Sequence, residues 1–353
     1  MDTARAVDTD WAERAAVAEQ AVTRRHLRRL LGLPGTALGV VSWPARSRDR
    51  WWLEWHYWWQ AHLVDCLVDA ELRAPDPGRQ DRITAVLRTH RLRNLTGWTN
   101  SYHDDMAWLG LAMERAARVT AHDWSRPLSI LTDRLRSAWT EQGLPWRRGS
   151  DFFNAPANGP AAILMARTGH RDRAHDTSDW LDTVLRDPGT GLIRDGIRAD
   201  GSLVEAVYSY CQGVTLGLAV ELGQVDRAAR LVQAVDEHLC RDHVLQAGGG
   251  GDGGLFPGIL ARYLALAATH LPSDPGTAGT ARSTARAIVL ASAHACWQHR
   301  AEVNDPELGA LPLFSHRWDR PAPLPDDRAD TPERDLSVQL SGWMLLEAAA
   351  RVH

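Results

Sequence analysis

Two adjacent carboxylates, Asp104 and Asp105, are the residues of this sequence best suited to do chemistry together. Cleavage of a glycosidic bond needs one carboxyl group to protonate the leaving oxygen and a second to attack the sugar or activate water. In retaining enzymes these groups lie roughly 5–5.5 Å apart, which neighbouring residues on one helical turn can reach. Repulsion between two charges this close raises one pKa and supplies the acid. The pair therefore predicts a retaining glycosidase.

The same residues have a structural alternative. Ser101 and Asp104 have the spacing of a capping box, in which Ser101 would cap a helix and the acid would bind back to it. Acids are also common in first helical turns, because the helix dipole favours them there. Spacing alone favours this alternative, but it accounts for neither Asp105 nor the aromatic residues nearby. Both interpretations stay open at this point.

Tryptophan is unusually frequent, with 16 Trp against 5 Tyr and 4 Phe. A buried indole N–H needs a hydrogen-bond partner, so a core that needed only aromatic volume would be built as well with Phe. The excess suggests rings that stack on a ligand, although a large helical core that uses Trp explains it equally well. Aromatic and polar residues gather in four segments: 51–60, 98–105, 146–154 and 248–256.

The spacing of apolar residues predicts helix after helix and almost no strand. Between residues 226 and 239, for example, Leu231, Val232, Val235 and Leu239 form one apolar stripe. The predicted helices cover residues 8–33, 54–74, 78–92, 102–120, 123–141, 155–169, 171–186, 203–222, 224–242, 255–271, 276–298 and 333–351.

The connections between these helices alternate in length. Long segments follow the odd-numbered helices (34–53, 93–101, 142–154, 187–202, 243–254 and 299–332), and short turns follow the even-numbered ones. Helices joined by short turns run antiparallel, so every long loop would emerge at one end. We therefore predict an all-α fold, an (α/α)6 barrel of about six helical hairpins forming one domain over 1–353, with a ligand cleft at the long-loop end. An open solenoid is the alternative, but no repeated consensus supports it.

Composition and charge exclude several other classes. The 40 basic residues are all Arg and are scattered among 44 acidic residues. They form no basic stripe, so we do not expect the protein to bind nucleic acid. No apolar run reaches 18 residues, and the N-terminus does not resemble a signal peptide, so we expect no membrane span and a cytoplasmic location. The four Cys residues are far apart and fit no metal spacing. We expect free thiols, no metal and no cofactor.

The stretch from Tyr102 to Ala112, with Asp104, Asp105 and Trp108, resembles the Tyr-Asp-Asp…Trp…Leu-Ala signature of glycoside hydrolase family 76, the α-1,6-mannanases. Similar blocks follow in order along most of the chain, at residues 58–62, 154–162, 208–213, 251–264 and 335–343. This resemblance implies an (α/α)6 barrel and a retaining hydrolase of α-1,6-linked mannose chains. The expected partner is therefore a mannose-containing oligo- or polysaccharide.

By this resemblance, Asp104 is the nucleophile and Asp105 is the acid/base. Motif positions and the aromatic clusters together give the residues expected to bind substrate: Trp58, Trp59, His103, Trp146, Asn154, Asn158, Tyr210, Gln212 and Asp252. Some of these have simpler interpretations, since Asn158 would also suit a helix cap, and Tyr210 or Gln212 would satisfy buried backbone groups.

The sequence also departs from the family's pattern. Cys211 stands where an Asn is usual, and Pro257 replaces a frequent Lys, which puts the length and linkage of the substrate in question. Two rival functions follow from other features. A sugar epimerase or isomerase on the same barrel would use His62 and His103 as acid and base. A catalytically silent carbohydrate-binding protein is the second rival.

Overall fold

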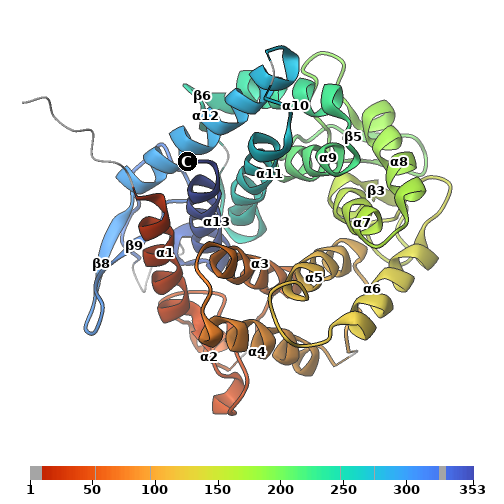
Figure 1. Ribbon diagram of the computed structural model, residues 1–353. Helices are drawn as coiled ribbons and strands as arrows, with labels where there is room; N and C mark the ends of the chain where they lie inside the picture. The colour runs from red at the N-terminus through yellow and green to blue at the C-terminus, as the bar shows by residue number, and fades with distance from the viewer. Residues whose placement is uncertain (1–9, 52, 96, 247, 274, 326–330) are drawn as a thin grey trace, which may run out of the picture.

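Six helices form a closed inner ring around the axis of the molecule (Figure 1). The computed structural model describes residues 10–51, 53–95, 97–246, 248–273, 275–325 and 331–353. Each inner helix packs against the next, and the last returns to the first. The inner helices are α3 (Tyr57–Arg73), α5 (His103–Ala116), α7 (Ala155–Arg167), α9 (Ser209–Leu222), α11 (Phe256–His270) and α13 (Leu336–Val352).

Six further helices surround this ring and alternate with the inner helices along the chain. They are α1 (Trp11–His26), α4 (Pro77–Arg93), α6 (Ser125–Ala138), α8 (Arg171–Trp180, continued by a π turn over Leu181–Leu185), α10 (Val225–Leu239) and α12 (Thr277–Gln298). A short helix, α2 (Ser47–Arg50), lies in the loop before α3. The predicted (α/α)6 barrel is confirmed. Because a long connection precedes every inner helix, all six inner helices begin at the loop-rich face.

The prediction of almost no strands is wrong within the long loops, which form small antiparallel pairs. These are β1 (Leu27–Arg28) with β2 (Leu38–Gly39), β3 (Phe152–Asn154) with β4 (Gly196–Arg198) and β5 (Leu203–Val204), β6 (Cys240–Arg241) with β7 (Val244–Leu245), and β8 (Ala301–Asp305) with β9 (Gly309–Leu313). Strands of two to five residues are too short to show an alternating pattern. Consequently the helix predicted over 8–33 ends at His26, and the one predicted over 203–222 begins at Ser209. Residues 8 and 9 lie outside the described part of the chain.

Glycine lets the inner helices approach one another closely. A Cβ on Gly213 of α9 would lie 3.0 Å from the Leu260 Cα of α11, and one on Gly159 of α7 would lie 2.5 Å from a Val214 methyl carbon of α9. Both positions have ordinary helical backbone, so what requires glycine there is the space that a side chain would occupy. The diameter of the ring therefore depends on small residues at its helix contacts.

Side-chain amides fasten the long loops to the inner helices. Gln60, the fourth residue of α3, accepts a hydrogen bond from the Gly39 N–H (2.8 Å) and donates one to the Gly39 carbonyl (3.0 Å). The same pairing recurs at the fourth residue of three other inner helices: Asn158 with Leu144, Gln212 with Ile193, and Gln339 with Phe314. In each of these amide clamps the partner belongs to the loop that precedes the helix. The clamps satisfy buried backbone groups that have no partner in a sheet or helix.

Ion pairs fill the interior of the ring toward the end that lies opposite the loop-rich face. Arg115 of α5 donates to Asp65 (2.6 Å) and to Asp69, and Arg262 of α11 also donates to Asp69 (2.6 Å). Burial opposes the charge on Asp69, but the two guanidinium groups outweigh it and lower the pKa of this carboxyl to about 2. A charged layer thus lies beneath the loop-rich face. All four Cys are free thiols, as predicted, and no helix among the described residues is long and apolar enough to cross a membrane.

Candidate active site

The aspartate pair lies in the first turn of α5, at the loop-rich face of the ring. The helix begins at His103, and its N-cap is Tyr102, which makes no side-chain capping bond. The capping-box alternative is therefore wrong, because Ser101 lies outside the cap position and Asp104 is the second helical residue. Asn100 shapes this turn instead, since its Oδ1 accepts from the Tyr102 N–H (2.9 Å).

The two carboxylates accept different hydrogen bonds. Asp104 Oδ1 accepts from the backbone N–H of Asp105 (2.9 Å), and its Oδ2 accepts from the indole N–H of Trp146 (2.9 Å). Asp105 Oδ2 accepts from the side-chain amide of Asn100 (2.6 Å). Both aspartates keep part of their surface exposed, so solvent or a ligand can reach them. Hydrogen bonds to a carboxylate favour its charged form, and Asp104 has more of them.

Burial raises the pKa of both carboxyl groups. For Asp104, the donors from Asp105 and Trp146 oppose this rise, while the negative charge of Asp252 adds to it. For Asp105, burial is again the largest cause, and the neighbouring charges of Asp104 and Asp252 raise its pKa further. Two carboxyl groups that interact this closely titrate as a pair and first lose one shared proton. Asp104, which accepts more hydrogen bonds, is the one favoured to hold the negative charge.

A third carboxylate, Asp252, links the tryptophans of α3 to this pair. Its Oδ1 accepts from the indole N–H of Trp58 (3.0 Å) and of Trp59 (2.9 Å). Trp59 is buried, whereas Trp58 is partly exposed. These contacts, and the effect of Asp252 on the pKa of both Asp104 and Asp105, bring together predicted residues from the first turns of α3 and α5 and from the segment before α11.

Partly exposed aromatic rings surround the carboxylates. Tyr210 and Phe256 stack in parallel with ring centroids 3.8 Å apart, and Trp146 packs edge-on against Tyr102 at 5.2 Å. Flat faces of this kind suit the apolar side of a sugar ring. Of the Trp-rich segment 51–60, Trp52 lies outside the described residues. The cleft itself remains a prediction, although aromatic residues predicted to line it lie close together here.

Sequence reasoning missed Asp195, a carboxyl group in the loop before α9. Its backbone is held in place by hydrogen bonds from the Ala155 N–H (2.8 Å) and to the Ala206 carbonyl (2.7 Å). Burial raises its pKa to about 6, against a weak opposing contact from the Cys211 thiol. The charges of Asp195 and Asp104 both add to the rise in the pKa of Tyr210, which burial causes first. No motif separates Asp195 from the other Asp residues of this loop.

Several residues predicted to bind substrate form hydrogen bonds with the backbone of the protein. His103 is 3% exposed and its Nδ1 contacts the Pro145 carbonyl (2.6 Å), next to Trp146. Asn154 is the N-cap of α7 and accepts from the Ala157 N–H (3.2 Å), so the cap considered for Asn158 belongs to Asn154. Asn158 and Gln212 have no exposed surface and form amide clamps. Direct contact of these four with a substrate stays a prediction.

Comparisons with known proteins agree with this architecture. The sequence model of glycosyl hydrolase family 76 matches residues 11–321. The GH76A α-1,6-mannanase of Salegentibacter sp. HEL1_6 superposes with a TM-score of 0.82 at 28% identity, covering 98% of this chain and 100% of that one. The Lin0763 protein of Listeria innocua has a TM-score of 0.80 at 25% identity, covering 97% of each chain. No curated protein matches the sequence.

A more distant likeness shows the fold alone. Dfg5 of Chaetomium thermophilum, solved in complex with glucosamine, has a TM-score of 0.73 at 16% identity, covering 99% of this chain and 92% of that one. The family match spans well over half of the sequence, and the mannanase covers nearly all of it. The chain therefore belongs to glycosyl hydrolase family 76 and is a glycoside hydrolase.

Proposed function

We propose that the protein hydrolyses α-1,6-mannosidic linkages with retention of configuration, using Asp104 as nucleophile and Asp105 as acid/base. The relatives support the substrate class. A variant of the Salegentibacter α-1,6-mannanase with two consecutive aspartates replaced by asparagine is described as inactive and was solved with α-1,6-mannotriose. Adjacent aspartates in the first turn of α5 are the matching feature of this chain.

The unequal hydrogen bonding of the two aspartates carries the assignment of roles. Asp104 accepts from a backbone N–H and from the Trp146 indole, and the N-terminus of α5 favours negative charge there. Asp105 accepts a single side-chain bond and faces the charge of Asp104, so it keeps the proton. A charged nucleophile beside a protonated acid is the starting state of a retaining glycosidase.

The reaction then proceeds in two displacements. A carboxylate oxygen of Asp104 attacks the anomeric carbon, the bond from that carbon to the leaving O6 breaks, and Asp105 gives its proton to that oxygen. The mannosyl group is now esterified to Asp104. Asp105, as a carboxylate, takes a proton from water while the water oxygen attacks the anomeric carbon and releases Asp104. Two inversions restore the original α configuration.

The surrounding side chains suit a mannosyl ring between them. Trp58 and the stacked Tyr210–Phe256 pair present flat faces, and Asp252 and Asp195 present carboxyl groups able to accept hydrogen bonds from sugar hydroxyls. We assign Asp195 to hydroxyl binding rather than to proton transfer, because no carboxyl group among the described residues is paired with it. A mannose oligo- or polysaccharide is the proposed substrate.

The two rival functions have less support. An epimerase would need histidines that reach a sugar, but His62 is 1% exposed and His103 is 3% exposed. Burial lowers the pKa of both imidazoles, that of His62 to about 3, so both stay neutral. A silent binding protein would have no use for two adjacent carboxyl groups with raised pKa values, since each ionisation at this buried position is costly.

Substitution of each aspartate tests the proposal. Asp104→Asn and Asp105→Asn should each lower kcat on α-1,6-mannotetraose by about a thousandfold or more, because each removes a group that acts in the transition state. Both variants should still bind the tetraose in calorimetry, which shows that they fold. Asp133→Asn changes an exposed aspartate of α6, so it is the matched control and should keep full activity. Activity near the wild-type level in either test variant would remove that residue from the mechanism.

A further inference from the structure

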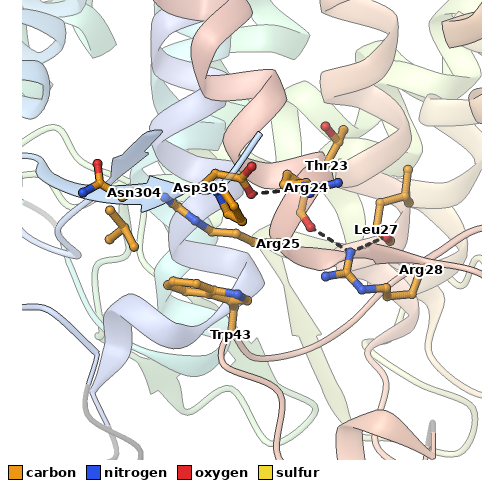
Figure 2. A pocket seen from close by; sticks show the side chains of 10 residues that line it. Thr23, Arg24, Arg25, Leu27, Arg28, Trp43, Asn304 and Asp305 are labelled. Carbon is orange, nitrogen blue, oxygen red and sulfur yellow. Dashed lines mark hydrogen bonds and ion pairs between the residues drawn. The ribbon is translucent and has the colours of Figure 1, made fainter. Parts of the chain in front are cut away.

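A basic groove lies on the outer side of the barrel, where α1 meets the loop before α3 and the β8–β9 hairpin. Two cavities of about 480 and 640 Å³ form it, and they share Arg25, Arg28 and Trp43 in their walls. Figure 2 shows the smaller cavity, with Arg25 lying over Trp43 and Arg24 bound to Asp305. We call the two cavities together the arginine groove.

Arg25 is a buried cation without a carboxylate partner. It is 6% exposed, and its guanidinium donates to the carbonyls of Pro312 (2.5 Å) and Leu311 (3.0 Å). Burial lowers its pKa to about 10, and the more distant charge of Asp305 only partly offsets this. Among the described residues, no acid lies within ion-pair distance of Arg25. Buried charges are normally paired, so an anion would complete this site.

Two neighbouring arginines also lack acidic partners in the described part of the chain. Arg28 donates to the carbonyls of Arg24 and Leu27 at the end of α1 (both 2.8 Å), and Arg29 lines the larger cavity. Arg24 differs from them, because it pairs with Asp305 (2.9 Å) and Glu307 (2.9 Å). The positive charge of the groove therefore comes from Arg25, Arg28 and Arg29.

Flat and apolar side chains form the rest of the wall. The Arg25 guanidinium lies 4.8 Å from the centre of the Trp43 ring, and Trp51, which is 69% exposed, lines the same cavity with Pro44 and Leu31. An indole beside a guanidinium suits a ligand with a ring that stacks and an oxyanion that takes bidentate hydrogen bonds. A free inorganic anion would leave the indole faces unused.

The groove is connected to the candidate active site by two hydrogen bonds, one to a backbone carbonyl and one to a side-chain carboxylate. The Trp43 N–H donates to the Arg334 carbonyl (2.8 Å), and the next residue, Asp335, accepts from the Gly251 N–H (2.7 Å). Gly251 precedes Asp252, which contacts the tryptophans of α3. Both sites thus belong to the loop-rich end of the barrel.

We propose that the arginine groove binds an anionic saccharide, one that carries a phosphate or carboxylate group on a pyranose ring. The oxyanion lies between Arg25, Arg28 and Arg29, and the ring stacks on Trp43 or Trp51. This binding is separate from the hydrolytic reaction and does not depend on it. It would let the enzyme hold an acidic substituent of a glycan while the aspartate pair acts on a different part.

Calorimetry with small probes tests the proposal. Mannose 6-phosphate and glucuronate represent the phosphate and carboxylate sources, and mannose, inorganic phosphate and anionic phospholipid vesicles are the comparisons. At least one of the two anionic sugars should bind more tightly than mannose and inorganic phosphate. Arg28→Gln should weaken that binding about tenfold, the size expected for one charge-assisted hydrogen bond. It should leave hydrolysis of neutral α-1,6-mannotetraose within about twofold of wild type, because Arg28 lies outside the aspartate pair's surroundings.

Arg136→Gln, an exposed arginine on α6, is the charge-matched control and should not change the affinity. Arg25→Gln is a second test, provided that its circular dichroism shows a folded protein. Equal affinity for inorganic phosphate and both anionic sugars would overturn the proposal, and so would binding to vesicles alone. Unchanged affinity in Arg28→Gln, or no binding of either anionic sugar, would overturn it as well.

Discussion

At the scale of single residues, Asp104 and Asp105 are neighbours in the chain but have different surroundings. Trp146, from the loop before α7, and the backbone N–H at the start of α5 stabilise charge on Asp104. Asp105 has the Asn100 amide and two nearby negative charges. In the proposed mechanism, environment and not residue type therefore separates the nucleophile, Asp104, from the acid, Asp105.

The raised pKa values predict an activity profile shifted toward higher pH. The active form carries one proton on the Asp104–Asp105 pair, and burial raises the pKa of both carboxyl groups. Below the lower of the two pKa values both carboxyl groups are protonated. Asp104 is then neutral and cannot attack the sugar. We expect kcat/KM at pH 4.5 to be about a tenth or less of its value at pH 7. Rates measured from pH 4 to 9 with a neutral substrate provide the check.

Asp252→Asn provides a second test of this profile. The charge of Asp252 raises the pKa of both members of the pair, so its removal should move the acidic limb to lower pH. An acidic limb that stays in place would mean that the charge of Asp252 does not raise these pKa values, and a wild-type optimum near pH 4.5 would mean that burial does not raise them.

The sequence indicated some of these residues better than others. Asp104, Asp105 and the indoles of Trp58 and Trp146 stand out because their types and clustering are unusual. Asp195 does not, because its importance depends on a loop path that brings it beside Tyr210. The sequence did not indicate that Asn158 and Gln212 bind the backbone of the preceding loops, although it marked both positions as candidates for substrate contact.

At the scale of elements, the amide clamps explain how long loops reach defined positions. Gln212 binds both polar groups of Ile193, two residues before Asp195, and also donates to the Tyr208 carbonyl (3.0 Å). The clamp therefore fixes the loop that carries Asp195 to the first turn of α9. Gln212, predicted from the sequence to bind substrate, therefore anchors in the structure the loop that carries Asp195.

Replacement of a clamp should destabilise the protein. In Gln212→Leu the buried N–H and C=O of Ile193 lose their partners, at a cost of about 1–3 kcal/mol for each unsatisfied group. We expect a drop of several degrees in Tm and a higher KM for mannotetraose, measured by calorimetry and kinetics. Gln233→Leu, on the exposed face of α10, removes an amide that donates to the exposed side chain of Glu237 and should change Tm little. An unchanged Tm in Gln212→Leu would contradict the anchoring role.

The helices were predictable for a physical reason, and their ends were less so. Apolar periodicity over ten or more residues identifies a helix such as α10, whose stripe of Leu231, Val232 and Val235 is buried as expected. The segment after His26 continues that kind of pattern, yet it pairs as β1 with β2. The pairing depends on residues about ten positions away, so the local sequence pattern does not predict it.

At the scale of the whole molecule, the barrel has two chemically different ends. Six inner helices begin at the loop-rich face, where their positive ends favour negative charge such as that of an ionised carboxyl group. Arginine–aspartate pairs between Arg115, Arg262 and Asp69 occupy the interior toward the other end. This polarity explains why the aspartate pair can ionise at one face while the interior beneath it stays closed by ion pairs. The alternation of loop lengths was enough to predict the polarity from sequence.

The anomeric configuration of the first product tests the central claim most directly. Proton NMR during digestion of α-1,6-mannotetraose should show the α anomer of the new reducing end first, with the β anomer appearing only by mutarotation. Asp104→Asn, measured in parallel, should release no reducing ends. A β anomer formed first would contradict the assignment of Asp104 as nucleophile, and tetraose left intact by the wild-type protein would contradict the proposed substrate.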